Sequence, residues 1–273
     1  MTTLEHKGGL AGKNILVTRP SGQADGLCRA ITAAGGHAIH FPAIEIQPLD
    51  REPDRQRLRD ATHHYDLLIY ISANAARFGP PAGQPKTLLA GGPATQKRLC
   101  AQGLKVGAPD GSPYDSEALL ALPALQSVMG QRILIVRGEG GRERLAETLR
   151  KRGAHVEYAQ VYRRALPSRK DISPSRPWTD NIHAITVTSV QILENLFRLW
   201  SPKHRDLLLS TPLVAASGRV LQKAREISFH LPVTVAANAG DQAMTEATIQ
   251  ALRHPTDCIS SRHEERIIRP QPH

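Results

Sequence analysis

Short apolar runs alternate along the chain with longer segments in which apolar residues recur every three to four positions. The run Asn14–Arg19 (NILVTR) precedes a helical pattern that continues to Ala34, and Gly35-Gly36 separates this helix from a second apolar run, His37–Phe41. Continuous Val, Ile and Leu runs of this length predict strands that are buried on both faces. Such strands are typical of parallel sheets covered by helices.

The same strand–helix–strand pattern returns 118 residues later. Arg132–Arg137 (RILIVR) leads through a glycine-rich loop into a helix that ends at Arg152, and Gly153 precedes the strand His155–Tyr158. At this offset, identical residues align as Ile15, Leu16, Arg19, Gly22, Leu27, Gly35 and His37 with Ile133, Leu134, Arg137, Gly140, Leu145, Gly153 and His155.

Three further pairs of segments follow in the same order at similar offsets. They are Asp66–Ser72 with His183–Ser189, Leu88–Leu99 with Leu213–Ala224, and Asp115–Leu122 with Asp241–Thr248. Four ordered matches indicate two copies of one α/β unit. We therefore predict an α/β protein with two similar doubly wound parallel-sheet domains.

Two segments, 42–49 and 159–167, alternate apolar and polar residues with period two. This pattern predicts a two-stranded β-ladder that is solvated on one side and acts as a hinge between the domains. Simple N-terminal and C-terminal halves fit the same periodicity and remain the alternative. The expected assignment is one discontinuous domain of 1–41 plus 168–253, linker strands 42–49 and 159–167, a second domain of 50–158, and a disordered tail of 254–273.

Charge narrows the range of ligands. The chain of 273 residues carries 35 Lys and Arg against 25 Asp and Glu, a formal net charge of +10, so it attracts anions. Nucleic acid, anionic lipid and a polyacidic small molecule all fit this charge. No run of five or six basic residues and no nucleic-acid-binding motif occurs, which disfavours nucleic acid as a partner. No apolar run approaches the roughly 20 residues of a membrane span, so no membrane partner is expected.

The remaining composition disfavours a secreted or metal-binding protein. Residues 1–12 contain no apolar stretch typical of a secretion signal, and the three cysteines cannot form an even disulfide framework. We expect reduced thiols and a cytoplasmic location. The motifs HExxH and CxxC are absent, so neither a metal site nor a cofactor is expected. No apolar surface patch is evident, which favours a monomer.

Candidate chemistry lies in the loops that follow the predicted strands, because open parallel sheets bind ligands at the carboxyl ends of their strands. The loop after RILIV contains Arg137, Gly138, Gly140 and Arg142. Its glycines let the backbone approach a ligand, and the helix start that follows presents free amides to an anion. A tight turn with a helix cap is the structural alternative, and the dinucleotide-binding pattern G-x-G-x-x-G is incomplete.

Equivalent loops elsewhere carry small, hydroxyl and basic residues. Ser72 and Ser189 can serve as helix N-caps, as ligand donors, or as both. We expect these helix starts to face one cleft between the domains and to bind an anionic substrate. The candidate binding residues outside the RILIV loop are Arg19, Ser72, Ala73, Gly92, Thr95, Ser189, Ser217, Gly218 and Arg219.

Tyr162 differs from the other four tyrosines because it lies in the second predicted linker strand, within Val161–Arg164 (VYRR). A strand in that place would line the cleft between the domains. Tyr162 is therefore the candidate catalytic residue, and a role in packing is the alternative.

At these residues the sequence resembles the uroporphyrinogen-III synthase family. The motifs that carry the resemblance are Ile15–Pro20, Ile71-Ser72, Gly92–Thr95, Arg137–Glu143 and Val161–Arg164, together with a second VTS at Val187–Ser189. The likeness extends from about Asn14 to Leu252. Each motif is weak alone, but their order on a duplicated α/β pattern is specific.

The resemblance implies two domains joined by a two-stranded ladder, and no cofactor or metal. It implies the closure of hydroxymethylbilane, a linear tetrapyrrole, with inversion of ring D and loss of water. The substrate carries four acetates and four propionates, hence about eight negative charges near neutral pH, which fits the basic chain. Tyr162 matches the family's candidate proton donor.

The chain departs from the family pattern at two places. Ile71 stands where many members have Thr, and Ser217–Val220 replaces a G-P-T-T type of turn. A non-catalytic tetrapyrrole-binding relative on the same fold is therefore the main alternative function, since a fold does not guarantee an activity. A nucleic-acid-binding protein is a third interpretation.

Overall fold

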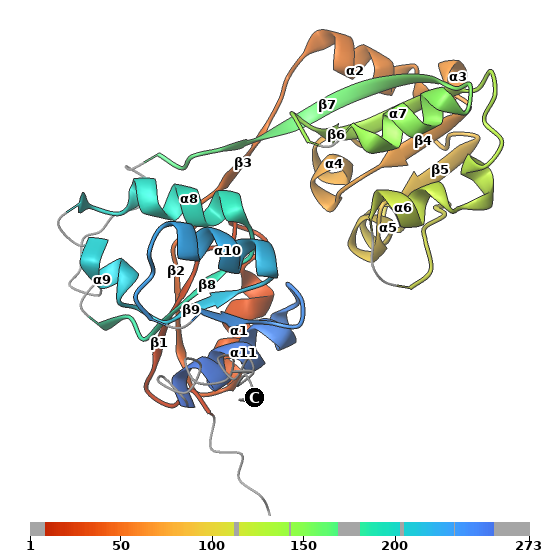
Figure 1. Cartoon of the computed structure of the whole chain (residues 1–273). Coiled ribbons are helices and arrows are strands. Elements are labelled where there is room, and N and C mark those ends of the chain that lie inside the picture. The colour runs from red at the N-terminus through yellow and green to blue at the C-terminus, as the bar shows by residue number, and fades with distance from the viewer. Residues whose placement is uncertain are drawn as a thin grey trace, which may run out of the picture. The chain divides into compact units, whose positions relative to one another are not determined.

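The computed structural model describes residues 9–111, 115–141, 143–168, 181–202, 205–231 and 233–253. They form two compact units, each with its own sheet (Figure 1). Unit 1 falls within Met1–Glu45 and Leu166–His273, and unit 2 is Ile46–Ala165. The predicted tail, 254–273, lies outside the described residues.

Unit 1 contains a five-stranded sheet in the order β10-β9-β8-β1-β2, and each pair of neighbours is parallel. The strands are β1 (Asn14–Val17), β2 (His37–His40), β8 (Ala184–Val187), β9 (Leu213–Ala215) and β10 (Val233–Val235). The helices are α1 (Asp25–Ala33), α8 (Val190–Leu199), α9 (Arg205–Leu209), α10 (Gly218–Glu226) and α11 (Asp241–Arg253).

The helices of unit 1 cover both faces of its sheet. Helix α1 packs against α11, and α8 packs against α10, as Figure 1 shows for the two sides of the sheet. Ile15 and Val17 of β1 are buried with Leu27 of α1 and Met244 of α11 in one core cluster. The apolar strand residues are therefore buried between helices.

Unit 2 contains a second five-stranded sheet in the order β3-β7-β6-β4-β5, in which β7, β6, β4 and β5 run parallel. The strands are β3 (Glu45–Pro48), β4 (Leu67–Tyr70), β5 (Thr87–Ala90), β6 (Arg132–Gly138) and β7 (His155–Ala165). The helices are α2 (Glu52–Arg59), α3 (Ala61–His64), α4 (Ala73–Phe78), α5 (Pro93–Cys100), α6 (Ser116–Leu120) and α7 (Arg144–Lys151), with a 3-10 turn, η1 (Pro123–Leu125).

Alternate residues of each central strand in unit 2 enter different cores. Leu68 and Tyr70 of β4 are buried in one cluster, whereas Leu67 and Ile69 are buried in another. Both faces of the sheet are therefore apolar, which explains why the strand reads as a continuous apolar run. The predicted α/β class with parallel, helix-covered sheets is confirmed.

The sequence repeat is also a structural repeat. Asn14 pairs with His37 in unit 1, and Arg132 pairs with His155 in unit 2, so the strand register is the same at the offset of 118 residues. The glycines that follow the two helices, Gly35 and Gly153, both have φ of 86°. Glycine is preferred in this left-handed conformation, and it ends both helices at the same point.

The two predicted linker segments belong to neighbouring strands in the sheet of unit 2. Strand β3 lies inside 42–49, and β7 continues without interruption from His155 to Ala165. The sequence interpretation separated 155–158 from 159–167, whereas the structure joins them, because neither glycine nor proline interrupts the strand. The role of these strands as a hinge stays a prediction.

Candidate active site

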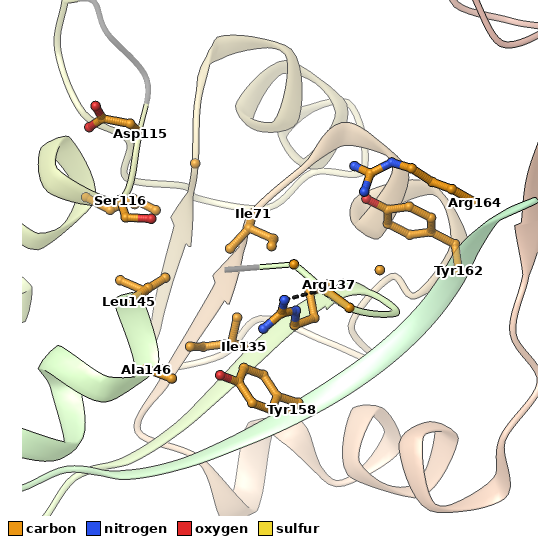
Figure 2. A pocket seen from close by; sticks show the side chains of 15 residues that line it. Ile71, Asp115, Ser116, Ile135, Arg137, Leu145, Ala146, Tyr158, Tyr162 and Arg164 are labelled. Carbon is orange, nitrogen blue, oxygen red and sulfur yellow. Dashed lines mark hydrogen bonds between the residues drawn. The ribbon is translucent and has the colours of Figure 1, made fainter. Parts of the chain in front are cut away.

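A cavity of about 270 Å³ lies at the carboxyl-terminal edge of the unit 2 sheet (Figure 2). Parallel strands end at the same edge, so their following loops meet there. The lining residues come from the ends of β4, β5 and β6, from α6 and α7, and from β7: Ile71, Gly91, Asp115, Ser116, Leu119, Ile135, Arg137, Gly138, Gly140, Gly141, Leu145, Ala146, Tyr158, Tyr162 and Arg164. Four of the predicted site residues, Tyr162, Arg137, Gly138 and Gly140, are thus brought together.

A β-bulge determines where the Tyr162 side chain lies. Arg137 pairs with Gln160, but the next residue, Gly138, pairs with Tyr162, so Val161 is an extra residue in β7. Since side chains alternate along a strand, one extra residue changes which of them lies opposite β6. The Glu139 amide donates to the Tyr162 carbonyl at 2.7 Å and holds the strands together beyond the bulge.

Gly138 makes room for the Tyr162 ring. A Cβ atom at this position would lie 2.5 Å from Cζ of Tyr162, closer than any real contact of that type. The glycine at the end of β6 is therefore required by close approach to an aromatic ring rather than by an unusual backbone conformation.

The Tyr162 hydroxyl contacts the start of a helix. Tyr162 is only 2% exposed, and its Oη lies 3.1 Å from Oγ of Ser72. Ser72 Oγ also accepts a hydrogen bond from the Ala75 amide at 3.1 Å, so Ser72 caps α4 as predicted. The Phe78 ring packs beside Tyr162 with centroids 6.3 Å apart. The Arg164 guanidinium lies 5.9 Å from the Tyr162 ring centroid, and Figure 2 shows these two side chains next to each other.

Arg137 is a buried cation beside the cavity. Its Nη1 donates to Glu143 at 2.9 Å, its Nη2 donates to the Gly140 carbonyl, and its Cζ lies 4.8 Å from the Tyr158 ring centroid. The side chain is 3% exposed, and Nε is the buried side-chain polar atom that has no partner within the described residues. An unused donor on a buried guanidinium is costly unless a ligand accepts from it.

Two side chains beside Arg137, Glu143 and Tyr158, have pKa values that differ from their ordinary values. The Tyr158 hydroxyl donates to the Glu143 carboxylate, and this bond, with the charge of Arg137, holds the pKa of Glu143 below its ordinary value. Burial raises the pKa of Tyr158, and the contact with Glu143 raises it further. The two shifts agree, since both favour a carboxylate beside a neutral phenol.

The other predicted residues of unit 2 lie at helix starts near the same edge. Ala73 is the first residue of α4, Gly92 precedes α5 as its N-cap, and Thr95 is buried in the first turn of α5. None of the three lines the cavity. Arg142 falls outside the described residues.

In unit 1 the predicted residues follow the ends of β1, β8 and β9. Arg19 is buried and donates to Asp241 and to the carbonyls of Gln23 and Ala239. Ser189 caps α8 by accepting from the Ile192 amide at 3.2 Å.

The third loop of unit 1 contains Ser217, Gly218 and Arg219. Ser217 occupies the N-cap position of α10 without a side-chain capping bond, Gly218 begins that helix, and Arg219 is exposed. None of the five predicted unit 1 residues lines the unit 2 cavity.

Sequence reasoning missed Tyr158, Glu143 and Arg164 as cavity or near-cavity residues. Arg164 follows Tyr162 by two positions, a spacing that places both side chains on one face of a strand, so this signal was available. Tyr158 is harder to find, because the bulge at Val161 interrupts the alternation between it and Tyr162. Glu143 reaches Arg137 only through the conformation of the intervening loop.

Within the described ranges, no three His, Cys, Asp or Glu side chains gather in a way that could hold a metal ion. Nor does that part of the chain include a helix long and apolar enough to cross a membrane.

A family model and individual proteins of known sequence point to the same family. Residues 25–246 match the family model described as Uroporphyrinogen-III synthase HemD. The uroporphyrinogen-III synthase of Escherichia coli (strain K12) is 32% identical over 245 residues, covering 86% of this chain and 99% of that protein.

Solved structures agree at the level of the fold. A mutant uroporphyrinogen III synthase from the extremely thermophilic bacterium Thermus thermophilus matches with a TM-score of 0.56 at 19% identity, covering 89% of this chain and 99% of that one. The Helicobacter pylori 26695 uroporphyrinogen-III synthetase matches with a TM-score of 0.55 at 14% identity, covering 87% and 99%.

Proposed function

Because this chain belongs to the uroporphyrinogen-III synthase family, we propose that it catalyses that family's reaction. Hydroxymethylbilane is closed to a ring with inversion of ring D and loss of water. The observation that carries the proposal is the buried Tyr162 hydroxyl, which lines the unit 2 cavity and contacts Ser72 at 3.1 Å.

In the proposed chemistry Tyr162 is the proton donor. Its phenol protonates the departing hydroxyl of the substrate, the carbon–oxygen bond breaks, and water leaves behind an azafulvene cation. Ser72 Oγ can turn its proton toward the phenolate and stabilise it. The substituted α-carbon of ring D attacks the cation to form a spiro intermediate. The earlier bond from that carbon to the methylene bridge of ring C then breaks, which leaves a second azafulvene cation, and the other α-carbon of ring D bonds to this cation, so that the ring is inverted. The proton finally lost from the ring carbon restores the phenol.

The carboxylates of the substrate are proposed to bind at the helix starts and arginines. The free Nε–H of Arg137 and the exposed Arg164 supply charged donors beside the cavity. Backbone amides near Gly140, Ala73 and Gly92 are proposed to supply neutral donors, and Thr95, whose amide already donates to the Gly92 carbonyl, remains a proposed side-chain contact. Arg19, Arg142, Ser189, Ser217, Gly218 and Arg219 remain proposed contacts.

A product assay tests the function. Hydroxymethylbilane is generated in situ with and without the protein, the products are oxidised, and the type I and type III porphyrins are separated. The substrate closes unaided to the type I isomer, so a shift to type III is the expected result. Unchanged type I product with folded protein would reject the proposal.

One observation favours the second candidate, a non-catalytic tetrapyrrole-binding relative. Ile71 lines the cavity where many family members carry Thr, so one hydroxyl is absent beside Ser72. Such a relative would bind a porphyrin octacarboxylate without altering the isomer ratio, which the same assay combined with a binding titration distinguishes.

The proposal extends to the setting of the enzyme. We place it in the cytoplasm as a monomer, with strands 42–49 and 159–167 as a hinge and with no nucleic-acid partner. The free thiols of Cys28 and Cys100 in the described part of the chain fit a reducing compartment. Sedimentation tests the monomer, and DNA affinity that falls steeply with salt would contradict the expected absence of nucleic-acid binding.

A further inference from the structure

Three side chains beside the cavity form one connected group, here called the Arg137 cluster: Arg137, Glu143 and Tyr158. One carboxylate oxygen of Glu143 accepts from Arg137, and the other accepts from the Tyr158 hydroxyl. The Tyr158 ring also faces the guanidinium at 4.8 Å (Figure 2). Arg137 is thus held by an ion pair on one edge and by an aromatic ring on its plane.

Two glycines in the loop after Arg137 allow Glu143 to reach the guanidinium. Gly140 and Gly141 have φ of 71° and 106°, a backbone conformation that favours glycine. A Cβ at Gly141 would lie 2.5 Å from Nη2 of Arg137. The glycines let the loop turn tightly enough for Glu143 to return to Arg137.

Unit 1 contains the repeat-related positions without this cluster. At the offset of 118 residues, Arg19 corresponds to Arg137, and His40 corresponds to Tyr158. His40 Nε2 contacts the backbone carbonyl of Arg19 at 2.9 Å instead of a carboxylate. Arg19 donates to two carbonyls and to Asp241, whereas Arg137 retains a buried Nε–H without a partner in the described structure.

We propose that Glu143 and Tyr158 are positioning residues that hold the Arg137 guanidinium at the cavity wall, where it receives an acidic group of the ligand. This inference rests on the proposed function, which supplies a polycarboxylate ligand. A guanidinium that is already held in place loses little rotamer freedom when the ligand binds, so the entropic cost of binding is lower. Nη1 and Nη2 each already donate to one partner, and Nε is the guanidinium nitrogen without a partner in the described residues.

The test compares Glu143→Gln and Tyr158→Phe with the wild type in the type III assay. Each variant removes a charge or a hydroxyl while keeping the side-chain shape. We expect KM to rise about fivefold in each, as for the loss of one hydrogen bond, with kcat changed less than about twofold. A lower KM in Glu143→Gln would overturn the proposal, since Glu143 would then compete with the substrate for Arg137.

A double-mutant cycle asks whether both residues act through Arg137. In an Arg137→Lys background, Glu143→Gln and Tyr158→Phe should change KM less than about twofold, because lysine lacks the planar group that they orient. An undiminished fivefold effect in that background would contradict a positioning role.

A similar group at the opposite end of β6 provides matched controls. The Tyr65 hydroxyl donates a hydrogen bond to the Glu157 carboxylate, and the Arg132 guanidinium lies 5.5 Å from the Tyr65 ring centroid. Neither Tyr65 nor Glu157 lines the cavity. Tyr65→Phe and Glu157→Gln should therefore lower the denaturation midpoint without raising KM. A rise in KM equal to that of the cluster variants would show that general destabilisation causes both effects.

A readout without substrate separates this inference from the proposed function. The Nε–Hε resonance of Arg137, assigned as the signal lost in Arg137→Lys, should be sharp in the wild type and broadened in Tyr158→Phe by exchange with solvent and between side-chain conformations. If the wild type forms no type III product but this difference appears, the proposed function fails and the positioning holds. An equally sharp signal in a folded Tyr158→Phe protein overturns the positioning.

Discussion

Ser72 Oγ lies 3.1 Å from Tyr162 Oη while it caps α4 through the Ala75 amide at 3.1 Å. One oxygen atom therefore connects a helix start with a buried phenol. The phenol belongs to β7 and the helix follows β4, so the contact joins two strands that are not neighbours in the sheet. We therefore predict that two substitutions of Ser72 can separate its contribution to stability, through the N-cap, from its contribution to activity, through Tyr162.

Ser72→Ala should lower the free energy of unfolding by about 1 kcal/mol, because the N-cap is lost. Ser72→Gly should cost only a few tenths of a kcal/mol, roughly, since glycine is tolerated at an N-cap. Both remove the hydroxyl beside Tyr162 and should reduce type III formation about equally. Urea denaturation and the isomer assay measure the two effects, and activity that follows stability across the pair would refute the role of the contact.

Tyr162→Phe is expected to lower type III formation about a hundredfold, because the proposed proton donor is lost while the ring remains. Circular dichroism should show an unchanged fold. Wild-type turnover in this variant would exclude Tyr162 from the proton transfer.

Gly138→Ala is expected to displace the Tyr162 ring, since the new methyl group would lie 2.5 Å from Cζ. Overpacking should cost about 1–3 kcal/mol of stability, and a misplaced hydroxyl should lower kcat about tenfold or more. Gly83→Ala is the matched control in the same unit, because its methyl group would meet only Thr62 at 3.4 Å. Similar losses in both variants would argue against the specific clash.

Burial raises the pKa of Tyr65 to about 12, and the neighbouring Glu157 contributes to this shift. A raised pKa in the folded state means that folding favours the neutral phenol. The corresponding stability is present below about pH 10, the ordinary value, and is lost as the pH rises through about 12. Tyr65→Phe should therefore flatten the fall in stability over this range, measured by urea denaturation at each pH. An equally steep fall in the variant would place its cause elsewhere.

Asp241→Asn tests the different use of the repeated arginine in unit 1. The Arg19 side chain is 10% exposed and pairs with Asp241, which is 44% exposed. Partial solvent screening limits the expected loss to about 1 kcal/mol, measured by denaturation. Asp50→Asn, which breaks the exposed pair with Arg55, should cost less than about 0.5 kcal/mol. Equal losses would contradict a structural role for the Arg19–Asp241 pair.

The fold was largely predictable because strand and helix signals of one unit occur again at the equivalent positions of the other unit. Strand β4 and strand β8 begin and end at positions 117 residues apart, and the glycines after α1 and α7 share one backbone conformation. Local apolar periodicity and helix-ending glycines are encoded within a few residues, so they can be read directly.

The site was predictable only in part. Arg137 and Gly138 are predicted from their place at a strand end, Tyr162 is predicted from its place in the linker strand 159–167, and all three line the cavity. The bulge at Val161 was not found, because one inserted residue leaves the apolar pattern almost unchanged. The pairing of Glu143 with Tyr158 was not found either, since a contact across a loop and two elements has no periodic signature.

The two copies differ in how far their first strand pair extends. In unit 1 the pairing ends at Val17 with His40, which corresponds in unit 2 to Ile135 with Tyr158. The pairing in unit 2 continues to Gly138 and Tyr162. Tyr162 thus stands beyond the segment that both copies retain. A substitution confined to this extension therefore changes the surroundings of Tyr162 and leaves intact the strand pairing that both units share.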